Sequence, residues 1–152
     1  MAANSKFAIA IHTMGVLAYM GERHVSSELI ATSVSTNPVV IRRIIRKFVT
    51  AGLVSVRMGT GGGATLRRPA TEISLFDIHS AIEDDRLFQV PHLASDHECP
   101  VGRFVRPVLA KVFGGLEVEL KSHLQGISLK DVMDEVASEI SAEKCSATKN
   151  EE

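Results

Sequence analysis

The chain has 152 residues and a formal net charge of −1, and 45% of its residues are hydrophobic. This length is typical of one compact domain with an added element, and no apolar run approaches the ~18 residues of a membrane span. The N-terminal residues lack the apolar core and cleavage site of a secretory signal, so we expect a cytoplasmic protein without membrane attachment. Two cysteines, Cys99 and Cys145, do not make a disulfide framework.

The net charge conceals an asymmetry between the two halves of the chain. Residues 1–70 contain nine Lys and Arg against two Glu, whereas the remainder contains eight Lys and Arg against sixteen Asp and Glu. A basic surface binds nucleic-acid phosphates. Single-strand binding would require aromatic stacking platforms, and few aromatic residues occur in the basic half. The charge pattern therefore favours a double-stranded nucleic acid as partner of the first half.

The first elements have the spacing of a helix-turn-helix motif. Apolar residues recur at helical intervals from Asn4 to Gly21, which predicts the first helix. Ser26 is placed to cap a second helix over residues 27–34, and the residues around it have the spacing of a hydrophobic staple. Residues 35–37 then form a tight turn before a third helix.

The third helix is short and basic. Asn37 is a favoured N-cap, Pro38 fits the first helical position, and Gly52 supplies the C-terminal stop. Apolar residues fall on one side of this helix and four cations on the other, namely Arg42, Arg43, Arg46 and Lys47. The pattern fits either a solvated amphipathic helix or a recognition helix in a DNA major groove.

A glycine-rich hairpin follows the basic helix. Residues 53–57 and 64–68 are predicted as its two strands, stopped by Pro69, and residues 58–63 form the turn. Such a hairpin directly after a recognition helix is a wing, which favours the DNA-binding interpretation. The glycines match a dinucleotide fingerprint only loosely, and a strand follows them where that fingerprint requires a helix, so we reject a nucleotide site.

The second half is predicted to be helical around an irregular segment. Ser74 begins a helix through a capping-box pattern with Asp77, and residues 86–100 are irregular. The longest helical pattern, about residues 101–125, carries an apolar stripe that is too long for one small core. We expect it to pair with its twin across a two-fold axis.

Two boundaries in the second half rest on single residues. Pro107 should kink the long helix or mark its true start. Ser128 caps a short last helix to about Ile140, and residues 141–152 are expected to be disordered.

In these motifs the chain resembles the IscR/NsrR/CymR-type winged-helix regulators of bacteria over roughly residues 4–140. The resemblance rests on the first helix and on the order and spacing of five further segments: Gly52-Leu53-Val54, Gly59-x-Gly61-Gly62-Gly63-x-x-Leu66-x-Arg68-Pro69, Ile73-Ser74-Leu75-Phe76-Asp77-Ile78, Cys99-Pro100-Val101-Gly102 and Ile127-Ser128-Leu129. It implies a homodimeric transcription factor, in many members a repressor.

The expected architecture is mainly α with a small two-stranded β wing. A winged helix-turn-helix DNA-binding domain would occupy residues 1–83, a sensor loop 84–100, and a dimerisation helix with a short terminal helix 101–140, before the tail at 141–152. The residues expected to contact operator DNA are Ser26, Thr36, Asn37, Arg42, Arg43, Arg46, Lys47, Arg57, Thr60, Gly61, Gly62, Arg67 and Arg68.

Cys99 is the candidate sensor residue. The family's iron–sulfur pattern needs three cysteines before the long helix, and this chain has one there, so no conventional cluster is expected. If the long helix begins at Pro100, Cys99 is its N-cap and would feel positive partial charge that favours the thiolate, and a protonated His97 would add to it. We hypothesise that an oxidant or a quinone modifies Cys99 and changes DNA affinity; an inert, packed Cys99 is the alternative.

Three further alternatives remain open at this point. Zinc, copper or an atypical cluster could be held by residues from His12, His24, His92, His97 and Cys99. Cys145 could act as a resolving thiol. A winged-helix module could also bind a protein in place of DNA. An enzyme is not expected, because no substrate pocket or nucleophile–base pair stands out.

Overall fold

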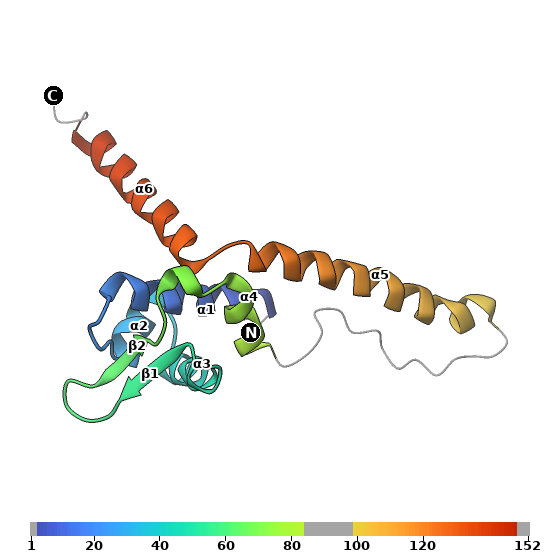
Figure 1. Cartoon of the computed structure of the whole chain (residues 1–152), viewed down its shortest axis with the longest axis horizontal. Coiled ribbons are helices and arrows are strands. Elements are labelled where there is room, and N and C mark those ends of the chain that lie inside the picture. Colours follow the sequence, from blue (N-terminus) through green and yellow to red (C-terminus); the bar gives the residue numbers. More distant parts are fainter. Residues whose placement is uncertain (1–2, 84–98, 149–152) are drawn as a thin grey trace.

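The computed structural model describes residues 3–83 and 99–148, with side chains over 5–83 and 99–143 (Figure 1). The predicted sensor loop therefore lies outside the described residues, apart from Cys99 and Pro100. The described elements are α1 (Ala3–Met20), α2 (Ser27–Val34), α3 (Pro38–Thr50), β1 (Val54–Arg57), β2 (Gly63–Leu66), the 3₁₀ turn η1 (Ala70–Glu72), α4 (Leu75–Ile82), α5 (Pro100–Gln125) and α6 (Leu129–Thr148). This confirms the predicted fold class. Within the described ranges, no helix is long and apolar enough to cross a membrane.

The helix-turn-helix forms where the capping residues predict it. The Ser26 hydroxyl accepts a hydrogen bond from the Leu29 N–H at 3.2 Å, and the Asn37 side chain accepts one from the Val39 N–H at 2.8 Å. Between the two helices, Ser35 adopts the left-handed conformation with φ of 55°. The Ser35 turn and the Asn37 cap therefore end α2 and begin α3 within three residues.

The wing is anchored to the beginning of α2. β1 and β2 pair antiparallel, with Val54 opposite Leu66. Val25 and Ala64 exchange two backbone hydrogen bonds of 3.0 and 2.9 Å, so the wing also pairs with the chain that leads into α2. Gly63 is required at this junction, because its φ is 148° and a Cβ there would lie 2.5 Å from the Val25 carbonyl oxygen.

One core joins α1, α2, α3, α4 and the wing. Its largest fully buried side chains come from each of these elements and from the first residue of α6: Phe48, Met14, Leu17, Ile30, Ile41, Leu53, Ile73, Ile78, Ile82, Leu129 and Val54. The polar side chain of Thr13 is also buried, and its hydroxyl donates to the Ile9 carbonyl at 2.8 Å. The basic helix is thus fixed by its apolar face.

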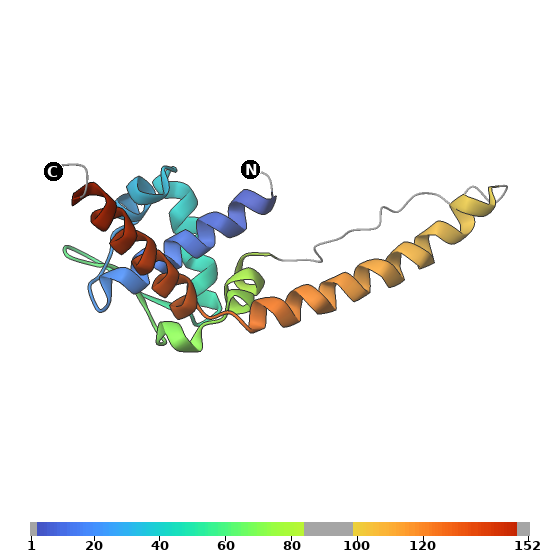
Figure 2. The same cartoon turned by 90° about the horizontal axis from the view of Figure 1, so that it is seen from above.

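The long helix α5 extends away from this core (Figures 1 and 2). Cys99 is its N-cap and Pro100 its first residue, as predicted. The helix continues through Pro107, so the alternative that Pro107 marks its start is wrong. Leu124, near the C-terminal end of α5, is buried, and the other residues of this helix are exposed or half-buried.

A short backbone connection joins α5 and α6 to the core formed by α1 to α4 and the wing. The Leu75 N–H donates to the Ile127 carbonyl at 2.9 Å, and the Leu129 N–H donates to the Ile73 carbonyl at 2.8 Å. From this junction α6 packs on α1. The predicted end of the last helix near Ile140 is wrong, and so is the expected disorder of residues 141–148, because α6 continues to Thr148. The Ala, Glu and Lys residues of this segment favour helix, a propensity that outweighs their polarity.

Candidate nucleic-acid interface

The outward face of α3 presents two arginines. Ile41, Ile44, Ile45 and Phe48 are buried on the inner face. Successive helical residues turn by 100°, so Val39, Arg43, Arg46 and Thr50 cluster on the opposite side, and all four are exposed. This face can approach a DNA major groove without disturbing the core.

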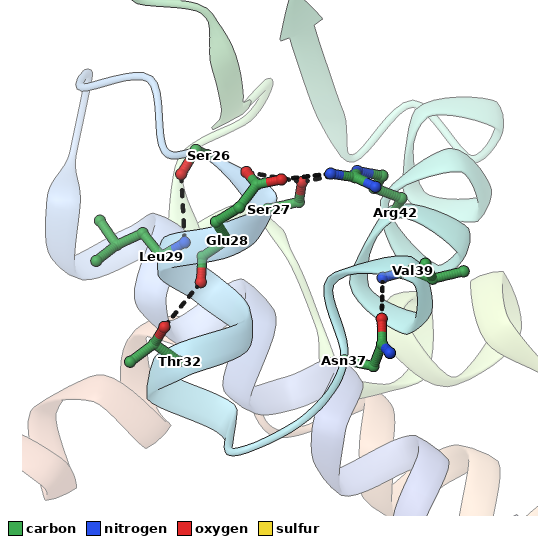
Figure 3. Close-up of polar contacts among 8 residues, drawn as sticks. All are labelled: Ser26, Ser27, Glu28, Leu29, Thr32, Asn37, Val39 and Arg42. Carbon is green, nitrogen blue, oxygen red and sulfur yellow. Dashed lines mark hydrogen bonds and ion pairs between the residues drawn. The ribbon is translucent and has the colours of Figure 1, made fainter.

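Arg42 lies at the edge of this face and is engaged with α2 (Figure 3). Its guanidinium donates through Nε to the Ser27 hydroxyl at 3.1 Å and through Nη2 to a Glu28 carboxylate oxygen. The hydrogen bond from the Glu28 backbone N–H and the Arg42 guanidinium both hold the pKa of the Glu28 carboxyl below its ordinary value. The sequence places Arg42 among the expected DNA contacts but gives no such role to Glu28, although an acidic residue two positions after the Ser26 cap is a signal for the first turn of a helix.

Lys47 lies apart from the other cations of α3. Its ammonium donates to the Ile82 carbonyl at the C-terminal end of α4, at 3.0 Å, and the residue is half-buried. A cation at a helix C-terminus satisfies a carbonyl that has no partner within the helix. This contact ties α3 to α4 and engages the Lys47 ammonium within the protein.

The wing stands beside α3 and borders a cleft with it. Arg57, Thr60, Gly61 and Arg67 are exposed, whereas Arg68 is half-buried. The cleft has a volume of about 720 Å³ and is lined by Arg42 and Arg46 together with apolar residues of both elements, including Val49, Val56 and Met58. Met58, on the wing, is 87% exposed and is a surface residue that sequence patterning did not single out.

Three of the predicted contacts have structural duties of their own. Ser26 caps α2 and Asn37 caps α3, and both residues are exposed. A Cβ at Gly62 would lie 2.2 Å from the Arg57 carbonyl oxygen, so glycine is required there by the turn of the wing. Thr36, between the caps, is half-buried.

The described sensor candidates do not form a metal centre. Cys99 is exposed and accepts a long hydrogen bond from the Gly102 N–H at 3.5 Å. His12 pairs with the Ser33 hydroxyl at 3.1 Å and His24 is exposed, while His92 and His97 lie outside the described residues. Within residues 5–83 and 99–143, no group of three or more His, Cys, Asp or Glu side chains could hold a metal ion.

A helix-turn-helix with an arginine-bearing second helix and an adjoining wing defines the class: a winged helix-turn-helix protein with a DNA-binding fold. Residues 3–135 match the model of the Rrf2 family, described as iron-dependent transcriptional regulators. The chain belongs to this family. It is therefore a transcriptional regulator and not an enzyme, as the sequence predicted.

Similar proteins agree with this assignment. A Bacillus subtilis protein described as the HTH-type transcriptional regulator YwnA is 38% identical over 132 residues, covering 86% of this chain and 96% of YwnA. A crystal structure described as a DNA-binding protein is 33% identical, with a TM-score of 0.67 over 84% of this chain and 98% of its own. IscR from T. potens has the same TM-score at 22% identity, over 90% and 88% of the two chains, and so shares the fold.

The family is described as iron-dependent, and iron–sulfur clusters are held by thiolates. The donors of this chain do not fit such a cluster. Such clusters use several cysteine ligands. The whole sequence has two cysteines, of which Cys99 is the one with a described side chain. Cys99 is exposed, and no neighbouring donors among the described residues could complete a metal site with it.

Proposed function

We propose that the chain is a homodimeric regulator that binds double-stranded operator DNA through α3 and the wing, and that it acts as a repressor. The observation that carries the proposal is the outward face of α3, where the exposed Arg43 and Arg46 lie opposite the buried apolar face of a helix that borders a cleft with the wing. Arginines in this position serve both guanine edges in the major groove and phosphates. Ser26, Asn37, Arg57 and Arg67 extend the same surface.

The exposed apolar side of α5 supports the dimer. Val101, Phe104, Val108, Val112 and Leu116 have exposed fractions of 70, 58, 59, 52 and 44%. A row of large apolar side chains on a helix is stabilised when a partner covers it, and a second copy of the same helix is the symmetric solution. A two-fold dimer would place two copies of α3 at two half-sites of a palindromic operator.

Duplex binding over a salt series tests the DNA-binding proposal. The duplex would be the protein's own upstream region, because such regulators often control their own gene. Arg43→Ala should weaken binding and flatten the slope of log affinity against log salt by about 0.9, the contribution of one phosphate contact. Lys130→Ala, which removes an exposed cation from α6, should leave the slope unchanged.

Two outcomes would contradict the proposal. An equal slope for Arg43→Ala and the wild type would remove Arg43 from the interface. Absence of salt-dependent binding by the wild type would favour the module that binds a protein in place of DNA.

We further propose a thiol switch at Cys99. Its exposed sulfur at the first turn of α5, on a helix whose apolar face lacks cover, is the observation that favours it. The thiolate would add to a quinone ring, forming a C–S bond while the ring takes up a proton and becomes a hydroquinone. A modified Cys99 would then alter the dimer and the spacing of its two α3 helices.

Quinone treatment followed by duplex binding tests the switch. Binding should be lost in the wild type and retained in Cys99→Ser, and mass spectrometry should locate one adduct at Cys99. Modification at Cys145 alone, or binding that is indifferent to treatment, would discard Cys99 as the sensor. Metal analysis of protein purified without oxygen tests the alternative donors His12, His24, His92 and His97.

A further inference from the structure

A polar cluster joins the two helices of the helix-turn-helix on its exposed side (Figure 3). Arg42 of α3 donates to Ser27 and to Glu28, both in the first turn of α2. Ser27 in turn donates to the Glu28 carboxylate at 3.3 Å. The guanidinium is thereby held in one orientation by two acceptors that belong to the other helix.

Stability alone does not account for this cluster. The side chains of Arg42 and Glu28 are 53 and 59% exposed, and exposed ion pairs add little to the free energy of unfolding. The core already fixes α3 against α2 through Ile30, Ile41 and Ile45. The pair is therefore better explained by the surface on which it lies.

That surface is the one proposed to meet DNA. Arg42 lines the cleft between α3 and the wing together with Arg46 and Ser27. The first turn of α2, capped by Ser26, carries backbone N–H groups and positive partial charge, which attract phosphate. Glu28 is the acidic residue of this turn, and its carboxylate neutralises the adjacent arginine and repels phosphates.

We infer that Glu28 is a specificity-determining residue of the DNA interface, which holds Arg42 in a fixed orientation and withholds its charge from a non-cognate duplex. This inference rests on the proposed function. Any duplex can attract a loose arginine through its phosphates, whereas an arginine held in place acts on DNA that presents an acceptor at the matching position. Glu28 acts through Arg42 and is a positioning residue.

Glu28→Gln tests the inference, because it removes the charge and keeps the size of the side chain. On a random-sequence duplex, Arg42 should then act as a free cation, and the salt slope should steepen by about 0.9. A fourfold rise in salt would accordingly reduce affinity ~3.5-fold more than in the wild type. On a duplex selected by the wild type from a random pool, affinity should rise less, so the ratio of the two affinities should fall.

Glu22→Gln is the matched control. Glu22 is an exposed residue of the turn between α1 and α2 and carries the same charge in the same domain, so a general effect of net charge would appear equally in both variants. The expected result is a steeper slope for Glu28→Gln alone. Equal changes in the two variants would overturn the inference.

A double-mutant cycle with Arg42→Ala separates positioning from a direct effect of Glu28. The effect of Glu28→Gln on the slope should vanish when Arg42 is already alanine, because no cation remains to be released. An effect that persists in that background would overturn the inference, since it would come from the carboxylate itself or from the start of α2. Absence of salt-dependent binding by the wild type would instead overturn the proposed function, which makes the two failures distinguishable.

Discussion

The winged helix-turn-helix buries its large apolar side chains, whereas the long helix α5 leaves most of its own exposed. Phe48 of α3 is fully buried, whereas Phe104 of α5 is 58% exposed. The short amphipathic helices and the wing cover one another, so this domain carries its own core. α5 spans 26 residues but contributes Leu124 as its buried residue, so most of its apolar surface remains available to a partner.

The two regions also differ in what polar interactions do for them. In the first region, caps and a cation at the end of α4 define where α3 lies, and arginines remain exposed on the outward face of α3. In α5, Arg103 lies over the ring of Phe104 at 5.3 Å, an exposed contact without a core beneath it. One region thus stabilises itself and presents charge, and the other presents apolar surface.

The largest effect should come from truncating the core of the first region. Phe48→Ala removes a fully buried ring and leaves a cavity, which should lower the free energy of unfolding by about 3–5 kcal/mol. Chemical denaturation measures this change. Phe104→Ala, the same substitution on the exposed face of α5, should barely change unfolding at protein concentrations where the chain is monomeric. Similar losses in both variants would mean that Phe104 is packed as firmly as Phe48, contrary to the difference in burial between the two regions.

A charge placed on α5 should act through assembly. Val112→Asp would bury a carboxylate in each copy of the paired helix and forfeit about 1.5–3 kcal/mol of apolar burial per side chain. Sedimentation should therefore show dissociation to monomers, with the circular dichroism spectrum retained. Ser122→Asp, an exposed polar position on the same helix, is the control and should remain dimeric. A dimer unaffected by Val112→Asp would place the interface elsewhere.

Sequence patterning located most of these features because they depend on local chemistry. The caps at Ser26, Asn37 and Ser74 and the start of α5 at Pro100 are encoded by neighbouring residues. The inward turn of Lys47 and the pairing of Arg42 with Glu28 depend on how helices pack, since their partners lie 35 and 14 residues away. Periodicity puts all four cations of α3 on one polar side and does not resolve which of them pair with neighbouring helices.

A smaller effect should follow from loss of the cap that begins α4. The Ser74 hydroxyl accepts from the Asp77 N–H at 3.1 Å, and the Asp77 carboxylate accepts from the Ser74 N–H at 2.8 Å. Ser74→Ala should reduce the free energy of unfolding by about 1 kcal/mol. Because Ser74 also adjoins the backbone connection to α6, the variant tests whether the two regions unfold together. Two separate thermal transitions in Ser74→Ala would show that they unfold independently.

The smallest effect concerns the beginning of α6 and depends on pH. Hydrogen bonds from the Ser128 hydroxyl and backbone N–H hold the pKa of the Asp131 carboxyl below its ordinary value. A lowered folded-state pKa means that the ionised carboxylate stabilises the native state above the unfolded-state pKa, and that this contribution is lost as pH falls through the folded-state pKa.

Asp131→Asn should therefore lower the thermal midpoint at neutral pH and converge with the wild type in acid. Glu135→Gln removes one negative charge from an exposed position of α6 without touching the cap, and its difference from the wild type should lack this acid convergence if the Ser128 hydrogen bonds are the cause. Parallel pH profiles for the two variants would assign the change in thermal midpoint to net charge on the acidic half. The hydrogen bonds of Asp131 would then make no specific contribution to the junction between the two regions.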